Sequence, residues 1–139
     1  MAFRFRVSAF AHAAGMPAWL LVVLGSALGG LARWSVVEWM LTRCGPGFPW
    51  GTLLVNVCGG LLIGACAPFA GRDPVKFGLM IGFLGGFTTF SAYSLQTFEL
   101  LQAGRVGLAA AYVFGSVAAC LAACWLGWTL ARALSGAGS

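Results

Sequence analysis

An apolar stretch at residues 75–102 is interrupted in its middle by residues that do not favour a continuous helix. The run from Gly82 to Ser94 reads G-F-L-G-G-F-T-T-F-S-A-Y-S. Gly85 and Gly86 remove side-chain support, and several hydroxyl side chains follow them. Within a membrane, irregular backbone is tolerated only where it lines a cavity or is buried in protein. We therefore predict a helix break here and take this segment as the first candidate for the functional part.

The composition places the whole chain in a membrane. Of 139 residues, 60% are hydrophobic and only 8% are charged, which leaves too little polar surface for a water-soluble globule. A membrane-spanning helix needs roughly 20 apolar residues. We predict an all-α integral membrane protein with a short surface leader at 1–16, a four-helix transmembrane domain at 17–133 and a polar tail at 134–139. The predicted spans are 17–40, 51–70, 75–102 and 106–132, the third being broken.

The distribution of basic residues bears on orientation and assembly. The net charge of +5 comes mostly from residues at segment ends, which is typical of interfacial anchoring rather than of a nucleic-acid partner. Without the leader, the two sides of the membrane carry equal numbers of basic residues, so the positive-inside rule selects no orientation. Four packed helices also fill their own centre. We therefore expect a homodimer of oppositely oriented copies. One side would carry Arg72, Lys76 and Arg132, and the other Arg33, Arg43 and Arg105.

The polar side chains within the apolar segments are rich in hydrogen-bond donors. Asn56 lies in the second span, Ser116 in the fourth, and a series of hydroxyls follows the glycine pair. No carboxylate joins them, because all three acidic residues lie in a loop or towards span ends. Such a lining suits a small anion. The hydroxyls of the third span belong to Thr88, Thr89, Ser91, Ser94 and Thr97.

Two further features accompany the break. Phe90 and Tyr93 share a helix face, so the positive edges of their rings can point at an anion. Unwound backbone exposes carbonyl oxygens, which could hold a hard monovalent cation such as sodium. No nucleophile has a base near it in the sequence, so we do not expect an enzyme.

Two other functions fit the size of the chain less well. A proton-coupled small multidrug exporter needs a carboxylate embedded in the first span, and the only candidate, Glu38, lies near the wet end of that span. A purely structural membrane subunit would leave the broken helix and Asn56 without an explanation.

Three motifs connect the chain to a known family. They are G-G-L-A-R-W at Gly29–Trp34, W-G-T-L-L-V-N at Trp50–Asn56 and G-F-L-G-G-F-T-T-F-S at Gly82–Ser91. With these motifs the chain resembles the Fluc (CrcB) family of fluoride channels from about residue 29 to residue 131.

The resemblance implies a passive fluoride channel of the bacterial plasma (inner) membrane that lowers cytoplasmic fluoride. It implies a dual-topology homodimer with two fluoride pathways and a central structural sodium ion held by the backbone carbonyls of Gly85 and Thr88. Arg33 would lie near a vestibule. The fluoride path would be lined by Asn56, Thr89, Phe90, Ser91, Tyr93 and Ser116.

The chain departs from the family pattern at three positions. Tyr93 stands where a second phenylalanine is usual, Gln96 where an acidic residue is frequent, and Cys120 where a hydroxyl can occur. The Tyr93 hydroxyl could donate to fluoride or narrow the path. We expect function to persist with an altered rate.

Overall fold

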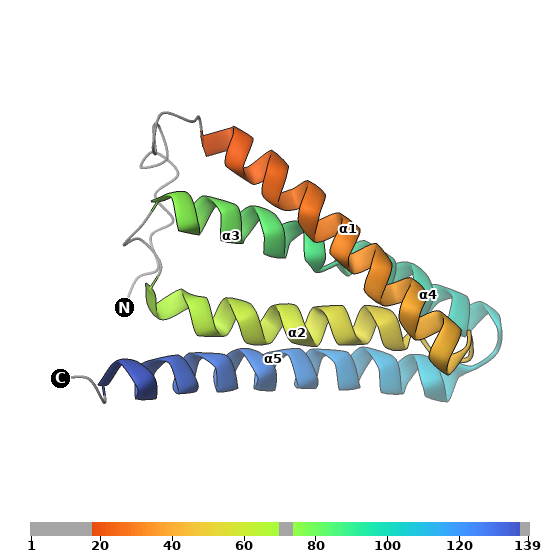
Figure 1. Ribbon diagram of the computed structural model, residues 1–139. Helices are drawn as coiled ribbons and strands as arrows, with labels where there is room; N and C mark the ends of the chain where they lie inside the picture. Colours follow the sequence, from red (N-terminus) through yellow and green to blue (C-terminus); the bar gives the residue numbers. More distant parts are fainter. Residues whose placement is uncertain (1–17, 70–73, 137–139) are drawn as a thin grey trace.

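The computed structural model describes residues 18–69 and 74–136, and within these residues every regular element is a helix. Three helices are long and two are short (Figure 1). A single 3-10 turn, Ala67–Phe69, extends the second helix. The α-helices are α1 (Ala18–Cys44), α2 (Trp50–Cys66), α3 (Pro74–Phe87), α4 (Phe90–Gln102) and α5 (Val106–Gly136).

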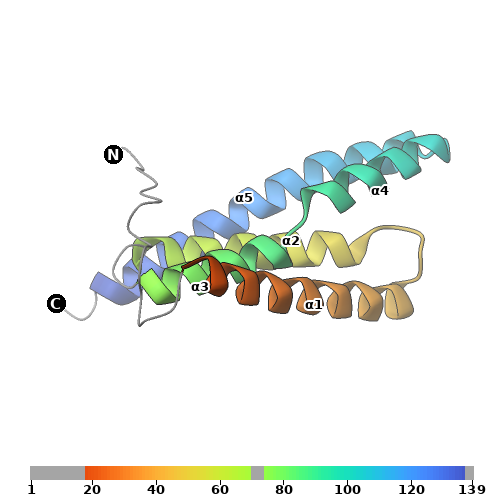
Figure 2. The same cartoon turned by 90° about the horizontal axis from the view of Figure 1, so that it is seen from above.

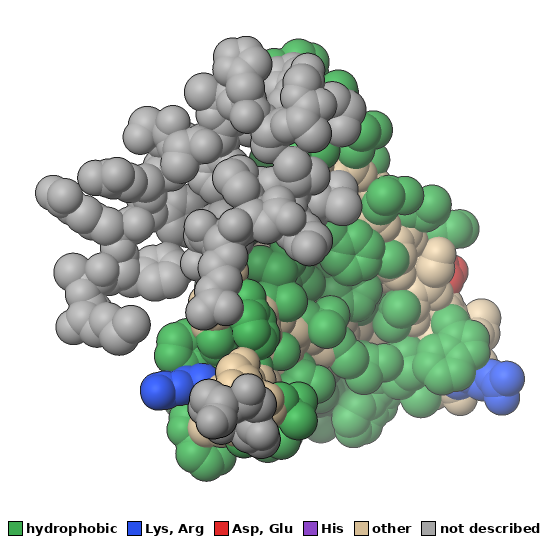
Figure 3. Space-filling model, turned by 60° about the vertical axis from the view of Figure 1, so that its left-hand side comes forward, with side chains coloured by type: hydrophobic (Ala, Val, Ile, Leu, Met, Phe, Trp, Pro, Cys, Tyr) green, Lys and Arg blue, Asp and Glu red, His purple; other side chains and the backbone are tan. Residues whose placement is uncertain are grey.

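The three long helices confirm that this is a membrane protein. The segments Trp19–Cys44, Trp50–Phe69 and Val106–Ser135 are long and apolar enough to cross a bilayer. Hydrophobic side chains cover most of the described part of the face seen in Figure 3, and the basic side chains that this part shows lie at its two ends. Such a surface is costly to expose to water and suits lipid.

The predicted third span consists of two separate helices. α3 has 14 residues and α4 has 13, so neither alone reaches the roughly 20 residues that a crossing requires. α5 continues to Gly136, so residues 134–136 of the predicted polar tail are helical. The predicted leader at 1–16 lies outside the described residues.

The helices pack as two pairs. α1 packs mainly against α3, and α2 runs parallel to α5 with extensive contact (Figures 1 and 2). α4 departs from α3 and lies along the first turns of α5. The break between α3 and α4 therefore lies where the two pairs meet.

Glycines recur at four-residue spacing in the sequence, at Gly25 and Gly29, Gly60 and Gly64, and Gly82 and Gly86, and this spacing predicts that paired backbones approach closely. A Cβ on Gly29 would lie 2.8 Å from the backbone nitrogen of Phe87, and one on Gly60 would lie 2.9 Å from the carbonyl oxygen of Cys120. Gly82 and Gly86 make the same kind of contact with α1. Backbone atoms cannot move aside as a flexible side chain can, so each contact requires glycine.

Gly29→Ala is therefore expected to destabilise the protein. The new methyl group would push α1 away from α3, and overpacking of this kind costs about 1–3 kcal/mol. Gly30→Ala is the matched control, since a Cβ there meets nothing within 4 Å. Thermal unfolding of the detergent-solubilised protein should show a lower midpoint for the first variant only. Equal midpoints for both variants would contradict the close contact.

Candidate functional site

The break between the two short helices falls at Thr88 and Thr89. This lies within the stretch Gly82–Ser94 where we predicted a break, although Gly85 and Gly86 themselves lie within α3. A Cβ on Gly86 would lie 2.8 Å from the Ser26 Cα, whereas one on Gly85 would meet nothing within 4 Å. Gly86 thus serves helix packing. The helix stops because the next residues make other hydrogen bonds.

Thr89 ends one helix and begins the next. Its backbone is extended, with φ −152° and ψ 123°, and its side chain accepts a hydrogen bond from the Ala92 N–H as a helix N-cap. The hydroxyls of Thr89 and Ser91 lie 3.1 Å apart. These bonds fix where α4 starts.

Asn56 of α2 supplies the hydrogen bonds that the broken helix lacks. Its Oδ1 accepts the Thr89 N–H at 2.8 Å, and its Nδ2 donates to the Thr89 carbonyl at 3.0 Å. A single side-chain amide therefore bonds to both the backbone N–H and the backbone carbonyl of Thr89. Unpaired backbone groups in an apolar setting are costly, so this pair of bonds holds the break open and ties it to α2.

Because of these side-chain bonds, two backbone carbonyls lose the N–H donors that they would have in a continuous helix. In a continuous helix the Gly85 carbonyl would accept from the Thr89 N–H, which here donates to Asn56. The Thr88 carbonyl would accept from the Ala92 N–H, which here donates to the Thr89 side chain. These are the two carbonyls predicted to hold sodium, and their geometry leaves them available as oxygen ligands.

A pocket of about 270 Å³, named here the Asn56 pocket, lies beside the break. The Ser116 side chain is 95% buried and its Oγ has no hydrogen-bond partner. No acidic or basic side chain among the described residues lines this pocket. Its lining residues are Asn56, Thr88, Thr89, Phe90, Tyr93, Ser116, Val117, Cys120 and Leu121.

The structure brings together five of the six residues predicted for the fluoride path. Ser91 does not line the Asn56 pocket; it is exposed and its hydroxyl faces Thr89. Arg33 is half-buried on α1 and does not line the pocket either. Val117, Cys120 and Leu121 also line it; the family pattern had marked Cys120 alone, and the apolar positions Val117 and Leu121 gave no sign of this. The roles of all these residues in permeation stay predictions.

The two aromatic rings beside the pocket differ in their surroundings. Phe90 is 78% exposed, and its ring centroid lies 5.3 Å from that of Tyr93. Tyr93 is buried, and its hydroxyl donates to the Val113 carbonyl of α5 at 3.3 Å. The hydroxyl that we expected at the path is thus engaged with the neighbouring helix.

Neither carboxylate in the described residues, Glu38 or Glu99, lines the Asn56 pocket. Glu38 and Glu99 are both exposed. Among the residues described, no three His, Cys, Asp or Glu side chains are grouped so that they could hold a metal ion. The buried carboxylate that a proton-coupled exporter needs is not supplied by Glu38.

Comparison with known proteins identifies the family. The family model described as "CrcB-like protein, Camphor Resistance (CrcB)" matches residues 20–128. The chain belongs to the CrcB family. It is 48% identical over 118 residues to the "Fluoride-specific ion channel FluC" of Geobacter metallireducens, a match that covers 81% of this chain and 95% of the relative. It is 44% identical over 126 residues to the protein of that name from Thermus thermophilus, covering 88% and 99%.

CrcB membership bears on the broader predictions. The family that the three motifs resemble is confirmed, and the relatives are channels by name, so the chain belongs among ion channels rather than enzymes. Together with the three long apolar helices, the bacterial relatives confirm a multi-pass bacterial membrane protein.

Asn56→Leu is expected to destabilise the CrcB fold as well as change the site. It removes the acceptor of the Thr89 N–H and one of the donors to the Thr89 carbonyl, and a backbone group left unsatisfied costs about 1–3 kcal/mol. Ser94→Ala is the control, because the Ser94 hydroxyl bonds only to the Phe90 carbonyl one turn earlier and is exposed. Denaturant titration in detergent should show a clear loss of stability for Asn56→Leu alone. Unchanged stability would mean that Asn56 does not hold the break.

Proposed function

We propose that this CrcB protein is a fluoride-selective channel through which the anion leaves the bacterial cytoplasm passively, across the plasma (inner) membrane. The observation that carries the proposal is the Asn56 pocket, where a buried Ser116 hydroxyl without a partner faces a lining free of carboxylates. The relatives named fluoride-specific ion channels supply the identity of the anion.

Fluoride is small and strongly hydrated, so a selective path must replace its water with hydrogen-bond donors. Ser116 has a free hydroxyl. The Asn56 amide nitrogen carries two hydrogens and uses one of them on Thr89, which leaves one to donate. The exposed Phe90 ring adds a positive edge that attracts an anion weakly. Several weak sites allow an ion both to enter and to leave.

The proposed transmembrane domain has four crossings, with α3 and α4 joined end to end as a broken third crossing. Two copies in opposite orientations form the channel, with two fluoride paths. The outward-facing Gly85 supports this assembly, because a Cβ there would meet nothing in the single copy although the residue lies deep in the third crossing. An antiparallel two-fold dimer would bring this face of each copy against its own counterpart.

A structural sodium ion at the dimer axis belongs to the same proposal. The Gly85 and Thr88 carbonyls of both copies would hold it, since their usual helical donors are diverted to Asn56 and Thr89. Neutral carbonyl oxygens suit a hard monovalent cation, whereas calcium usually recruits carboxylates. When bound, the ion would neutralise the partial negative charge of these carbonyls and hold the copies together.

Liposomes that contain the protein are expected to release fluoride and to retain chloride. A fluoride electrode measures the first and a chloride electrode the second, with protein-free liposomes as the blank. Equal release of both anions, or release of neither, would overturn the proposed function.

Phe90→Ile should slow fluoride release while the dimer stays intact, because the ring edge is lost and an apolar side chain remains. Phe98→Ile is a matched control on the same helix, since Phe98 is also exposed but does not line the Asn56 pocket. If both variants release fluoride at the wild-type rate, Phe90 does not act in the path.

The two orientations are expected in near-equal numbers. A single introduced cysteine in the exposed Arg105 turn should react with an impermeant thiol reagent from each side of an intact membrane, in about half of the copies. The native Cys44 is exposed at the end of α1. It is replaced by serine for this measurement, so that the reagent labels the introduced cysteine instead. Complete labelling from one side would exclude the antiparallel dimer.

A further inference from the structure

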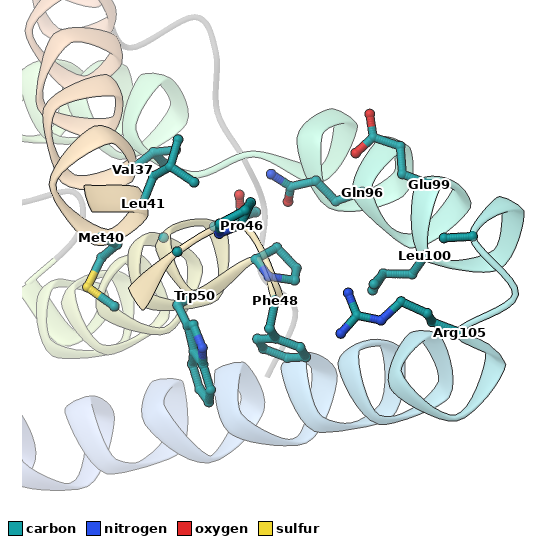
Figure 4. Close-up of a pocket in the computed structure, with 15 residues that line it drawn as sticks. Val37, Met40, Leu41, Pro46, Phe48, Trp50, Gln96, Glu99, Leu100 and Arg105 are labelled. Carbon is teal, nitrogen blue, oxygen red and sulfur yellow. The ribbon is translucent and has the colours of Figure 1, made fainter. Parts of the chain in front are cut away.

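A second pocket of about 330 Å³ lies at the end of the bundle where the α1–α2 and α4–α5 connections meet. We name it the Arg105 pocket. It lies next to the ends of α1 and α4 and the start of α2 (Figure 4). Unlike the Asn56 pocket, it has charged side chains at its wall. Its polar lining side chains are Thr52, Gln96, Glu99 and Arg105.

The side chains that point into this pocket are donors. Figure 4 shows the Arg105 guanidinium and the Gln96 amide directed inwards, whereas the Glu99 carboxylate is turned away from Arg105. The Gln96 Oε1 accepts a hydrogen bond from the Tyr112 hydroxyl at 3.1 Å. Its carbonyl oxygen is therefore occupied, and its two amide hydrogens are left to donate.

The two pockets are stacked along the same three helices. On α2, Thr52 of the Arg105 pocket precedes Asn56 by one turn, and on α4, Gln96 follows Tyr93 by about one turn. On α5, Tyr112 touches Gln96 and precedes Ser116 by one turn. Each helix thus contributes one polar residue at the level of each pocket.

A pair of tyrosines connects the two pockets: Tyr93 lines the Asn56 pocket, and Tyr112 bonds to Gln96 of the Arg105 pocket. The ring centroids of Tyr93 and Tyr112 lie 5.1 Å apart, and both side chains are buried. Their hydroxyls are held by Val113 and Gln96 respectively. An anion that leaves the Asn56 pocket past this pair would next meet donors and then a positive charge.

We propose that the Arg105 pocket is an anion-binding antechamber at one end of the path, in which a small monovalent anion such as fluoride keeps part of its water shell. The inference rests on the proposed function and extends it. Arg105 concentrates anions at this end through its charge, and Gln96 receives the ion with its amide hydrogens. A charge at a pocket rim acts over about 30 Å at 0.01 M salt but only over about 10 Å at 0.1 M.

Arg105→Gln should therefore slow fluoride release from liposomes several-fold at low ionic strength, and the difference should nearly vanish at high ionic strength. Arg105→Lys keeps the charge and should behave like the wild type. Substitution spares the two backbone hydrogen bonds of this residue, to Leu100 and from Ala109, so the α4–α5 turn should be preserved. Size-exclusion chromatography checks that each variant remains assembled.

Arg43→Gln is the matched control. Arg43 is exposed in the last turn of α1, at the same end of the bundle, and its guanidinium lies over the Trp39 ring rather than in the pocket. Equal slowing by both variants would assign the effect to general surface charge and overturn the antechamber. A salt-independent effect, or no effect of Arg105→Gln, would overturn it as well. Absence of fluoride release from the wild type would instead overturn the proposed function and the antechamber together.

Discussion

The paired hydrogen bonds between Asn56 and Thr89 determine how the rest of the molecule is arranged. A backbone cannot leave its helix within a membrane unless other groups satisfy it. Here a single amide from α2 does so, and α2 is itself fixed against α5. The break, the polar wall of the Asn56 pocket and the direction of α4 all follow from the place of that amide.

Much of this arrangement could be predicted from the sequence, because it depends on composition and on rare polar residues. The low content of charged residues indicated a membrane environment, and the hydroxyl cluster after Gly86 indicated the interrupted segment. Asn56 was recognisable as costly unless it had a purpose in the fold. The spacing of the glycines also predicted close helix contacts, which Gly29, Gly60 and Gly82 make.

The exact residues of the break within Gly82–Ser94 could not be predicted in the same way. A glycine pair is compatible both with an interruption and with tight packing, and only the approach of the Ser26 backbone shows that Gly86 serves packing. The engagement of the Tyr93 hydroxyl with Val113 depends on how α4 lies against α5. Arg105 resembled an ordinary interfacial anchor, since a turn residue acquires its neighbours only when the connections meet.

The open surface at Gly85 has a genetic consequence. If a second copy must cover this surface and complete the ring of carbonyls, a solitary copy does nothing, and the active fraction rises with the number of copies per area of membrane. Intact and variant copies made in the same cell would then pair with each other at random. A variant that inserts and pairs but spoils the shared ring of carbonyls would enter most pairs when it is in excess, so it should act dominantly over the intact protein in the same cell.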